Sequence, residues 1–158
     1  MHDLEPYYNW RGFYISSEDP NSPFFDREYS EFEFSEKIYN HYIHPQWDNI
    51  GSKTLYVKVI YADYDRATVV IELIGEWNDI LYNDIMYFKR ELIDILIGQG
   101  ISKFILMGEN VLNFHPDGID YYEEWFDEID EQEGYIALVN FRDHVQADMS
   151  EADIDSFF

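Results

Sequence analysis

Apolar residues in the middle of the chain are arranged as two short strands separated by a long helical stretch. Residues 68–74 form a β-branched, apolar run that is too short for a helix. The charged turn 63–66 and Gly75 bound this run, as turn residues bound a strand. A second apolar run, 103–107, follows two glycines and is typical of a buried parallel strand. We therefore expect both runs to be strands of one sheet.

The stretch between these runs, residues 77–97, has the periodicity of a helix. Six of its apolar side chains recur at steps of three or four, which places them on one helical face. These residues are Trp77, Leu81, Ile85, Phe88, Leu92 and Leu96. Gly98 and Gly100 would end the helix, because glycine adopts left-handed backbone angles without a Cβ clash. The three segments together predict a right-handed β-α-β unit.

Two further elements are predicted before and after this unit. Residues 54–61 read as a strand, and the loop 62–66 returns the chain into the strand at 68–74 as an antiparallel hairpin. Residues 119–130 read as a helix whose apolar side chains share one face. These side chains are Ile119, Tyr122, Phe126 and Ile129.

The remaining C-terminal segments have shorter patterns. Residues 108–118 contain asparagine, proline and glycine and are expected to be a connection. Residues 135–141 form another buried strand. Residues 150–158 form either a helix capped by Ser150 or a frayed tail.

The first 51 residues differ in composition from the rest of the chain. They contain four of the five prolines and many aromatic residues among acidic ones. We expect an edge strand at 10–16, a short strand at 28–34 and one or two helical turns at 35–42. This segment would cover the sheet with its aromatic side chains.

The order of elements predicts an α/β fold with a mixed β-sheet and helices packed mainly on one face. At 158 residues, the chain is long enough for one domain with a core and too short for two ordinary ones. We therefore expect a single domain 1–158. It would consist of an aromatic, acidic N-terminal cover (1–51), an α/β core (54–141) and a C-terminal tail or short helix (142–158).

The charge of the chain is strongly negative, with 33 Asp and Glu residues against 10 Lys and Arg and a formal net charge of −23. Such a chain repels nucleic-acid phosphates and anionic membranes, so we expect neither as a partner. The absence of cysteine excludes disulfides, thiolate metal sites and cysteine nucleophiles. The sequence has no signal-peptide pattern and no apolar run of about 18 residues, which favours a cytoplasmic location.

Two short motifs lie at the ends of the predicted strands. Gly75-Glu76 ends the first strand, and 114–119 reads Phe-His-Pro-Asp-Gly-Ile after the second. In these features residues 68–141 resemble the sulfate-transporter and anti-anti-sigma (STAS) domain, whose corresponding loop commonly reads Asp-Ser-Ser-Gly-Leu. The resemblance implies a β-β-α-β-α-β core. Pro116 and Asp117 stand where the family has its serines, so the phosphorylated switch residue is missing and Asp117 would supply a fixed negative charge.

Three patterns of metal-ligating or catalytic residues have plainer interpretations. His41 and His44 have the spacing of ligands on one helical face, but a proline follows directly and would end a helix. Residues 113–124 have the length of a calcium loop, but His115 and Asp120 stand where the loop needs an oxygen ligand and an apolar residue. Acid pairs along 123–131 are typical of a solvated helix face. We therefore expect no cofactor and no bound metal, and these patterns favour a non-enzymatic role over an enzymatic one while leaving the second open.

The aromatic residues of the N-terminal segment have two interpretations. They are Tyr7, Tyr8, Trp10, Phe24, Phe25, Tyr29, Phe32 and Trp47. Packing as core over the sheet is favoured, because buried aromatic rings dominate packing in a small domain. The alternative is an interface, at which an acidic rim would steer a basic partner.

The function that these patterns favour is a non-enzymatic, cytoplasmic protein-interaction or regulatory module that binds a partner of basic character. Its contact loop would contain Asn110, Asn113, His115, Asp117 and Asp120. Two alternatives stay open: a small enzyme or metal-dependent binding protein that uses His115 and Asp117, and an acidic inhibitor or immunity-type protein. The sequence also leaves open whether residues 1–51 pack on their own chain or across a homodimer.

Overall fold

Five strands form one mixed sheet in the computed structural model, which describes residues 5–7, 11–29, 37–38 and 41–158. The strand order is β3-β4-β5-β6-β7, with antiparallel pairing from β3 to β5 and parallel pairing from β5 to β7. The strands are β3 (Asp48–Asn49), β4 (Leu55–Asp63), β5 (Thr68–Asn78), β6 (Lys103–His115) and β7 (Tyr135–Val139). The predicted α/β fold, the β4–β5 hairpin and the parallel pairing of β5 with β6 are confirmed.

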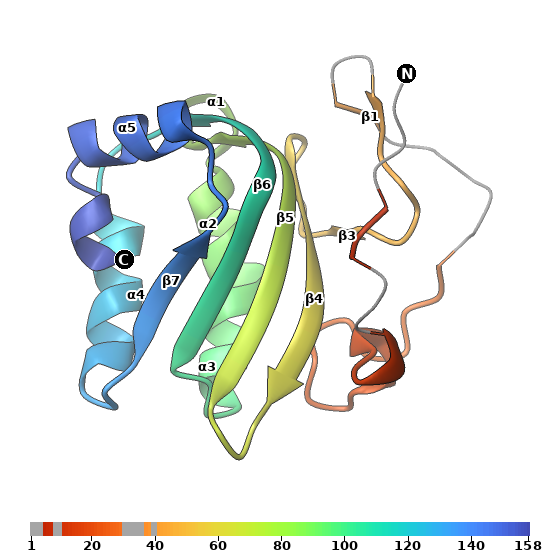
Figure 1. Ribbon diagram of the computed structural model, residues 1–158. Coiled ribbons are helices and arrows are strands. Elements are labelled where there is room, and N and C mark those ends of the chain that lie inside the picture. The colour runs from red at the N-terminus through yellow and green to blue at the C-terminus, as the bar shows by residue number, and fades with distance from the viewer. Residues whose placement is uncertain (1–4, 8–10, 30–36, 39–40) are drawn as a thin grey trace.

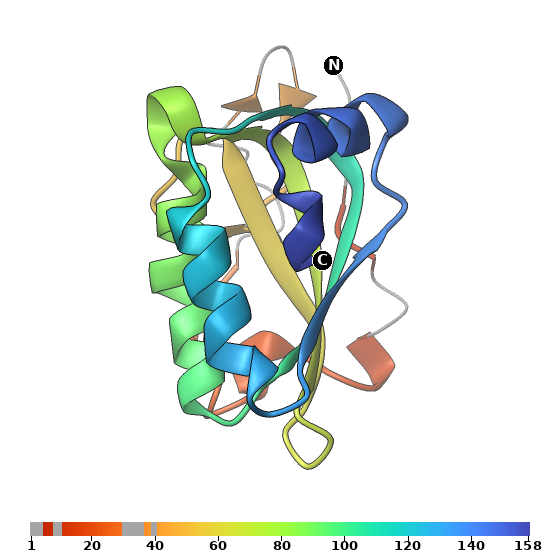
Figure 2. The same cartoon turned by 90° about the vertical axis from the view of Figure 1, so that its left-hand side faces the viewer.

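The long helices lie on one face of this sheet (Figures 1 and 2). Helical segments are α1 (Asp79–Tyr82), α2 (Asp84–Phe88), the π-helical turn η3 (Lys89–Ile93), α3 (Asp94–Gly98), α4 (Asp120–Asp130) and α5 (Asp143–Glu151). Two 3-10 turns, η2 (Ser16–Glu18) and η4 (Asp155–Phe157), complete the list. The predicted helix 119–130 is confirmed as α4.

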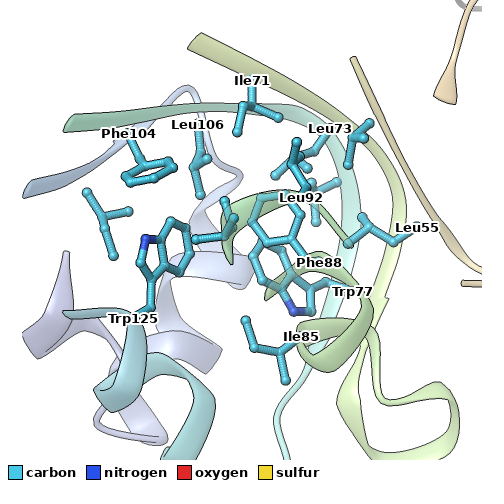
Figure 3. Packing of buried hydrophobic residues seen from close by; sticks show 14 of the residues in the cluster. Leu55, Ile71, Leu73, Trp77, Ile85, Phe88, Leu92, Phe104, Leu106 and Trp125 are labelled. Carbon is cyan, nitrogen blue, oxygen red and sulfur yellow. The ribbon is translucent and has the colours of Figure 1, made fainter. Parts of the chain in front are cut away.

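The helix face of the sheet holds the main hydrophobic core (Figure 3). Alternate residues of each strand point to this face because strand side chains have a period of two. Leu73 and Leu106 are fully buried there against Phe88, Leu92 and the helix α4. The ring of Trp125 packs edge-on against Phe88, at 5.7 Å between centroids. Packing of α2, α3 and α4 onto one sheet face therefore stabilises the fold.

The outer face of the sheet is covered along β4 and β5 by the N-terminal segment (Figure 1). Trp47 and Ile43 are buried against Tyr56 and Ile74 in a second, smaller cluster. Phe24 is buried in the main core instead. The expected cover is therefore present on the same chain over part of the outer face. Exposed Tyr7 and Phe25 do not fit a purely buried role, and Tyr8, Trp10 and Phe32 lie outside the described residues.

The elements predicted within the N-terminal segment are wrong where the structure describes them. Residues 11–18 form turns and η2 rather than an edge strand, because Ser16 to Asp19 close a tight turn. The expected strand 28–34 lies mostly outside the described residues. Instead of helical turns at 35–42, the chain forms an antiparallel hairpin of β1 (Lys37–Ile38) and β2 (His41–Tyr42).

The predicted helix 77–97 begins later and is interrupted. Trp77 is buried in β5, because that strand continues to Asn78. Asn83 adopts left-handed backbone angles (φ 53°) between α1 and α2, which ends α1 and changes the direction of the chain. Leu81 is therefore exposed rather than part of the buried stripe. The rest of the stripe is buried as predicted: Ile85, Phe88, Leu92 and Leu96.

Strand β6 is much longer than predicted, since residues 108–115 continue the strand instead of forming a connection. Gly108 is required there, because a Cβ atom would lie 2.3 Å from the ring of Phe141. Strand β7 pairs with β6 only as far as Met107. Beyond that point α5 contacts the open edge of β6, with Arg142 Nε donating to the carbonyl of Glu109 (3.1 Å) and His144 Nε2 to that of Leu112 (2.6 Å).

The C-terminal segment is helical, but the predicted cap is wrong. Helix α5 begins at Asp143 and ends at Glu151, so Ser150 lies in its last turn. Val145 and Met149 bury one side of this helix in the main core. The position of this helix is therefore determined by the core contacts of Val145 and Met149. The local sequence near Ser150 does not determine it.

Candidate functional site

The candidate site lies where the parallel strands β5 and β6 end side by side. Asn78 and His115 are register partners at these ends, and Glu76 pairs with Asn113 two residues earlier. In open α/β sheets, the carboxyl ends of parallel strands are the usual place for binding residues. The chain enters α1 directly after Asn78, and it enters α4 a few residues after His115.

The buried side chain of Asp84 holds together the chain segments that lie beneath this region. Its carboxylate is fully buried and accepts hydrogen bonds from Thr54 Oγ1 (2.7 Å), from the backbone N–H of Asn78 (2.8 Å) and from the Ser52 hydroxyl. Burial raises the pKa of Asp84, and these donors oppose the rise. The carboxylate thereby joins the start of β4, the end of β5 and the start of α2.

Asp79 makes a second buried connection. Its carboxylate accepts from the backbone N–H of Ile85 (2.8 Å), from Trp77 Nε1 (3.1 Å) and from the Tyr122 hydroxyl (2.6 Å). Burial raises the pKa of Asp79 to about 6, against the lowering effect of these donors. Because Tyr122 belongs to α4, Asp79 ties α1 to α4.

Between these two carboxylates, α1 presents three consecutive apolar side chains to solvent. Ile80, Leu81 and Tyr82 are 59%, 72% and 38% exposed. Asn78 caps the helix by accepting from the backbone N–H of Leu81 (2.9 Å). Single exposed apolar residues are ordinary on a protein surface, whereas a contiguous set on a fixed turn marks an interaction site.

A groove beside α1 adds negative charge to the apolar side chains. It has a volume of about 410 Å³ and is lined by Ile80, His115, Asp148 and Glu151, among others. His115 Nε2 lies 2.9 Å from Glu76 Oε1, which also accepts from Asn78 Nδ2. We define the carboxyl-edge surface as Ile80, Leu81, Tyr82, His115, Asp148 and Glu151.

The residues predicted to form a contact loop do not form one loop. Asn110 and Asn113 are half-buried on β6, and His115 is the last residue of that strand. Asp117 is exposed in the short link to α4, and Asp120 is the exposed first residue of α4. Of the five, the carboxyl-edge surface includes His115.

The apolar part of the carboxyl-edge surface is absent from the sequence prediction. The spacing of Leu81 fits the buried stripe of a continuous helix, and this fit hides its exposure. Asn78 and Asn83 were the available signal, since asparagine favours both helix caps and left-handed backbone angles.

The metal-site patterns are not supported by the backbone. Residues 113–115 belong to β6 and 120–124 to α4, so the calcium-loop interpretation is wrong. His41 lies in β2 rather than on a helix. Within residues 5–7, 11–29, 37–38 and 41–158, no group of three or more His, Asp or Glu residues could hold a metal ion.

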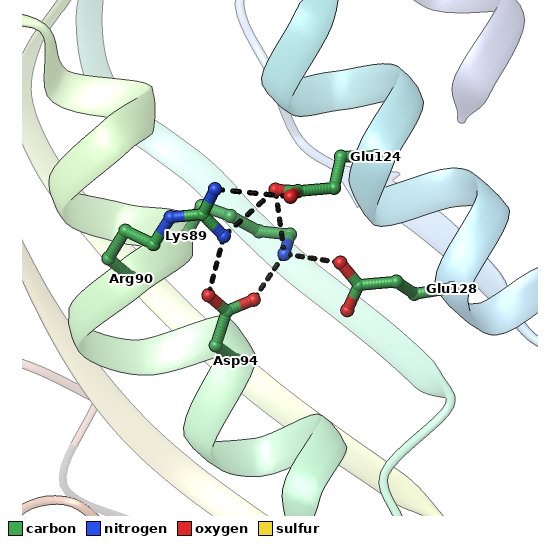
Figure 4. Close-up of polar contacts among 5 residues, drawn as sticks. All are labelled: Lys89, Arg90, Asp94, Glu124 and Glu128. Carbon is green, nitrogen blue, oxygen red and sulfur yellow. Dashed lines mark hydrogen bonds and ion pairs between the residues drawn. The ribbon is translucent and has the colours of Figure 1, made fainter.

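The acid pairs of α4 divide between solvent and an ion cluster (Figure 4). Lys89 is fully buried, and its ammonium contacts Glu128 (2.9 Å), Glu124 (3.2 Å) and Asp94. Arg90 joins the cluster through Asp94 (2.7 Å) and Glu124 (2.9 Å). The cluster therefore connects the η3–α3 helix to α4.

The cations and carboxylates of this cluster shift one another's pKa values. Burial alone would lower the pKa of Lys89, but the carboxylates of Asp94 and Glu128 outweigh it and raise the pKa. The Arg90 guanidinium and the Lys89 ammonium lower the pKa of Glu124. These pKa shifts favour the charged forms of Lys89 and Glu124.

Comparison with known proteins finds a distant structural similarity. Among solved structures, the phosphorylated form of the Bacillus cell fate determinant SpoIIAA is similar to this chain. The match has a TM-score of 0.46 and 19% identity, and it covers 64% of this chain and 86% of SpoIIAA. No protein-family model and no curated protein matches the sequence.

The described residues also bear on membrane insertion. They include no helix with the length and apolar character that crossing a membrane requires.

Proposed function

We propose that this chain is a non-enzymatic, cytoplasmic regulatory module that binds a basic protein partner through the carboxyl-edge surface. The observation that carries the proposal is the exposed apolar turn Ile80–Tyr82, held on a base of buried, hydrogen-bonded carboxylates. A fixed apolar turn can bind without first being ordered, which lowers the entropic cost of association.

Charge supports the choice of a basic partner. The whole chain has a formal net charge of −23, and Asp148 and Glu151 lie at the groove beside Ile80. Interfaces commonly combine a desolvated apolar centre with a charged rim that steers association. Here Leu81 and Tyr82 would form the centre, and the two acids would form the rim.

The partner is best found with a photo-crosslinking amino acid in place of Tyr82, used in lysate of the native host at low and at high salt. A crosslinked basic protein would then be purified and its affinity measured by calorimetry. We expect Leu81→Ser to weaken binding at least tenfold, the effect of removing a buried interface anchor. Asp148→Asn combined with Glu151→Gln should slow association and reduce its salt dependence.

Ile95→Ser is the matched control, because Ile95 is an exposed apolar residue on α3, outside the carboxyl-edge surface. Its affinity should equal that of the unsubstituted protein. Equal loss in Leu81→Ser and Ile95→Ser, or unchanged binding in Leu81→Ser, would contradict the proposal. Strong salt dependence without any effect of Leu81→Ser would favour an acidic inhibitor that acts by charge alone.

A further inference from the structure

A separate cavity lies on the outer face of the sheet, between β4 and the N-terminal segment. Its volume is about 170 Å³. Ile15, Ser16 and Tyr29 line it from the N-terminal segment, and Lys58 and Ile60 line it from β4. The pairing of β4 with β5 is irregular between Val59 and Tyr61, next to this cavity. Such irregularities of strand pairing are frequent next to binding sites.

Lys58 is a cation of this cavity whose ammonium makes charge contacts but no hydrogen bond to a described residue. Its side chain is 13% exposed, and its ammonium lies 3.9 Å from Asp48 Oδ2 and 4.0 Å from the centre of the Tyr29 ring. No hydrogen bond from this ammonium to a described residue is formed. Burial lowers the pKa of Lys58, and Asp48 opposes this effect.

The neighbouring carboxylates accept hydrogen bonds from donors other than Lys58, and Asp48 Oδ2, which faces Lys58, has no hydrogen-bond partner among the described residues. Asp48 accepts hydrogen bonds at Oδ1 from Arg27 (3.1 Å) and from the Tyr29 hydroxyl. Glu72 is the register partner of Lys58, but its carboxylate accepts instead from the backbone N–H of Tyr7 (2.7 Å). No ion pair between Lys58 and Glu72 is formed.

Arg11, which also lines the cavity, pairs with Glu5 at 2.7 Å. Arg27 is paired to Asp48 as well, so three cations, Lys58, Arg11 and Arg27, stand beside the three carboxylates Glu5, Asp48 and Glu72. Charge around the cavity is therefore balanced, and what the ammonium of Lys58 lacks is a hydrogen-bond acceptor. A buried donor without an acceptor costs free energy unless a ligand or water reaches it.

A second polar group of the cavity also lacks a partner. Ser16 is fully buried, and in the described part of the chain its hydroxyl has no hydrogen-bond partner. A buried hydroxyl without a partner costs free energy, so such groups are rare unless water or a ligand reaches them. Ser16 thus supplies a hydrogen bond to an occupant of the cavity, independently of charge.

We propose that this cavity binds a small organic carboxylate, with the ammonium of Lys58 facing the carboxylate and the hydroxyl of Ser16 as a second donor. The apolar body of the ligand would lie against Ile15, Ile60 and the tyrosine rings. These walls disfavour inorganic phosphate, which has no apolar surface to bury and carries more charge than Lys58 balances. The cavity and the carboxyl-edge surface share no residue, so this site does not depend on the proposed function.

The test uses benzoate as the carboxylate probe, with benzamide as its uncharged counterpart and inorganic phosphate as the compact anion. Binding to the full chain is followed by two-dimensional amide NMR. We expect benzoate to shift the amides of Ser16, Lys58 and Ile60 in a saturable way, while benzamide binds at least tenfold more weakly. Phosphate should leave these amides unchanged.

Two variants and one control separate a site from a general charge effect. Lys58→Met keeps the aliphatic stem and should weaken benzoate binding at least tenfold. Ser16→Ala should weaken it about threefold to tenfold and should not unfold the chain, because it removes only a hydroxyl that has no hydrogen-bond partner among the described residues. Lys103→Met, a half-buried lysine on β6 away from the cavity, should bind benzoate as the unsubstituted protein does.

Absence of saturable shifts at these amides would overturn the proposal. So would equal affinity for benzoate and benzamide, or equal losses in Ser16→Ala and Lys103→Met. If Lys58→Met does not fold, the benzoate affinity of Ser16→Ala is compared with that of Lys103→Met, and this comparison tests the proposal.

Discussion

The two faces of the sheet are built on different principles. On the helix face, strand residues such as Leu73 and Leu106 are fully buried in a core of apolar side chains. Buried charge occurs at its margins, where Asp79 and Lys89 have several partners each. The outer face instead has Lys58 and Glu72 in its centre, and its apolar cluster is small.

This difference suits the helix face to stabilising the fold and the outer face to binding a ligand. Well-packed apolar surface supplies most of the free energy of folding, so the helix face defines the fold. Unpaired polar groups near the outer face, Ser16 Oγ and Asp48 Oδ2, lower stability and are retained where a ligand can reach them. Among the described residues the helix side has two such groups, Glu124 Oε2 and the indole N–H of Trp125. The first lies in ion-pair contact with Lys89 and Arg90, and nothing in the structure explains the second.

Substituting two adjacent residues of β5 tests the comparison most directly. Leu73 points to the helix face and Ile74 to the outer face, and both are buried. We expect Leu73→Ala to reduce the free energy of unfolding by about 4 kcal/mol, and Ile74→Ala by about 2 kcal/mol, since the smaller cluster relaxes around the cavity. Urea denaturation of both variants measures the difference. Equal losses would show that the two faces contribute alike.

Asp79→Asn tests the buried carboxylate at the margin of the helix face. The pKa of Asp79 is about 6 in the fold against an ordinary 3.8, so the folded state binds the proton more tightly than the unfolded state. Stability is therefore lost as pH rises from 3.8 to about 6, by about 3 kcal/mol at most, because one pKa unit corresponds to roughly 1.4 kcal/mol.

Asp79→Asn should remove this pH dependence while keeping the acceptor for Ile85 and Trp77. The difference in unfolding free energy between the variant and the unsubstituted protein, measured across this range, isolates the effect from the other acids. A constant difference would mean that Asp79 is not the group that titrates. Asp65→Asn, in the exposed β4–β5 turn, is the control.

Lys89→Met tests the ion cluster that joins the helices. The variant leaves Asp94, Glu124 and Glu128 close together without their buried cation, and we expect a loss of about 2 kcal/mol, since the carboxylates remain partly solvated. Hydrogen bonds from Lys89 and Arg90 outweigh burial and lower the pKa of Asp94. The stabilisation is therefore present above the ordinary pKa of a carboxyl group and lost as pH falls through the lowered value.

The measurement for Lys89→Met is urea denaturation at neutral pH and again in acid. At neutral pH the variant should be less stable, and in acid the two proteins should converge. A difference that persists unchanged in acid would assign the loss to packing of the Lys89 stem instead of to charge.

Arg90→Gln gives the smallest expected effect. Arg90 contacts two of the same carboxylates, Asp94 and Glu124, but its side chain is exposed. Exposed ion pairs contribute little, so the loss should be about 0.5 kcal/mol or less. High salt should remove it, whereas the loss in Lys89→Met should persist. A loss as large as that of Lys89→Met would show that burial does not distinguish the two cations.

The sequence predicts the sheet well because apolar runs are local signals. The runs at 68–74 and 103–107 contain mostly strand-forming residues, and their parallel pairing follows from the helix between them. The extension of β6 to His115 is hidden by Gly108, Asn110 and Asn113, which have low strand propensity. Contacts with β5 and α5 hold these residues extended, and such contacts are not local.

The candidate site is less predictable than the fold. The exposure of Leu81 depends on the left-handed turn at Asn83, which removes it from the stripe that continues at Ile85. The burial of Lys89 depends on three acids, two of which lie on α4, and no pattern near Lys89 identifies them. A spacing of three or four identifies a helix, but it does not state where the helix starts.

The open edge of β6 has a consequence for self-association. Residues 108–115 extend beyond β7, and α5 occupies that side through Arg142 and His144. An uncovered strand edge is a template for pairing with a second molecule. The C-terminal helix therefore blocks strand pairing at this edge, and we expect a shortened chain that ends at Asn140 to expose both the edge of β6 and the core surface that Val145 and Met149 cover.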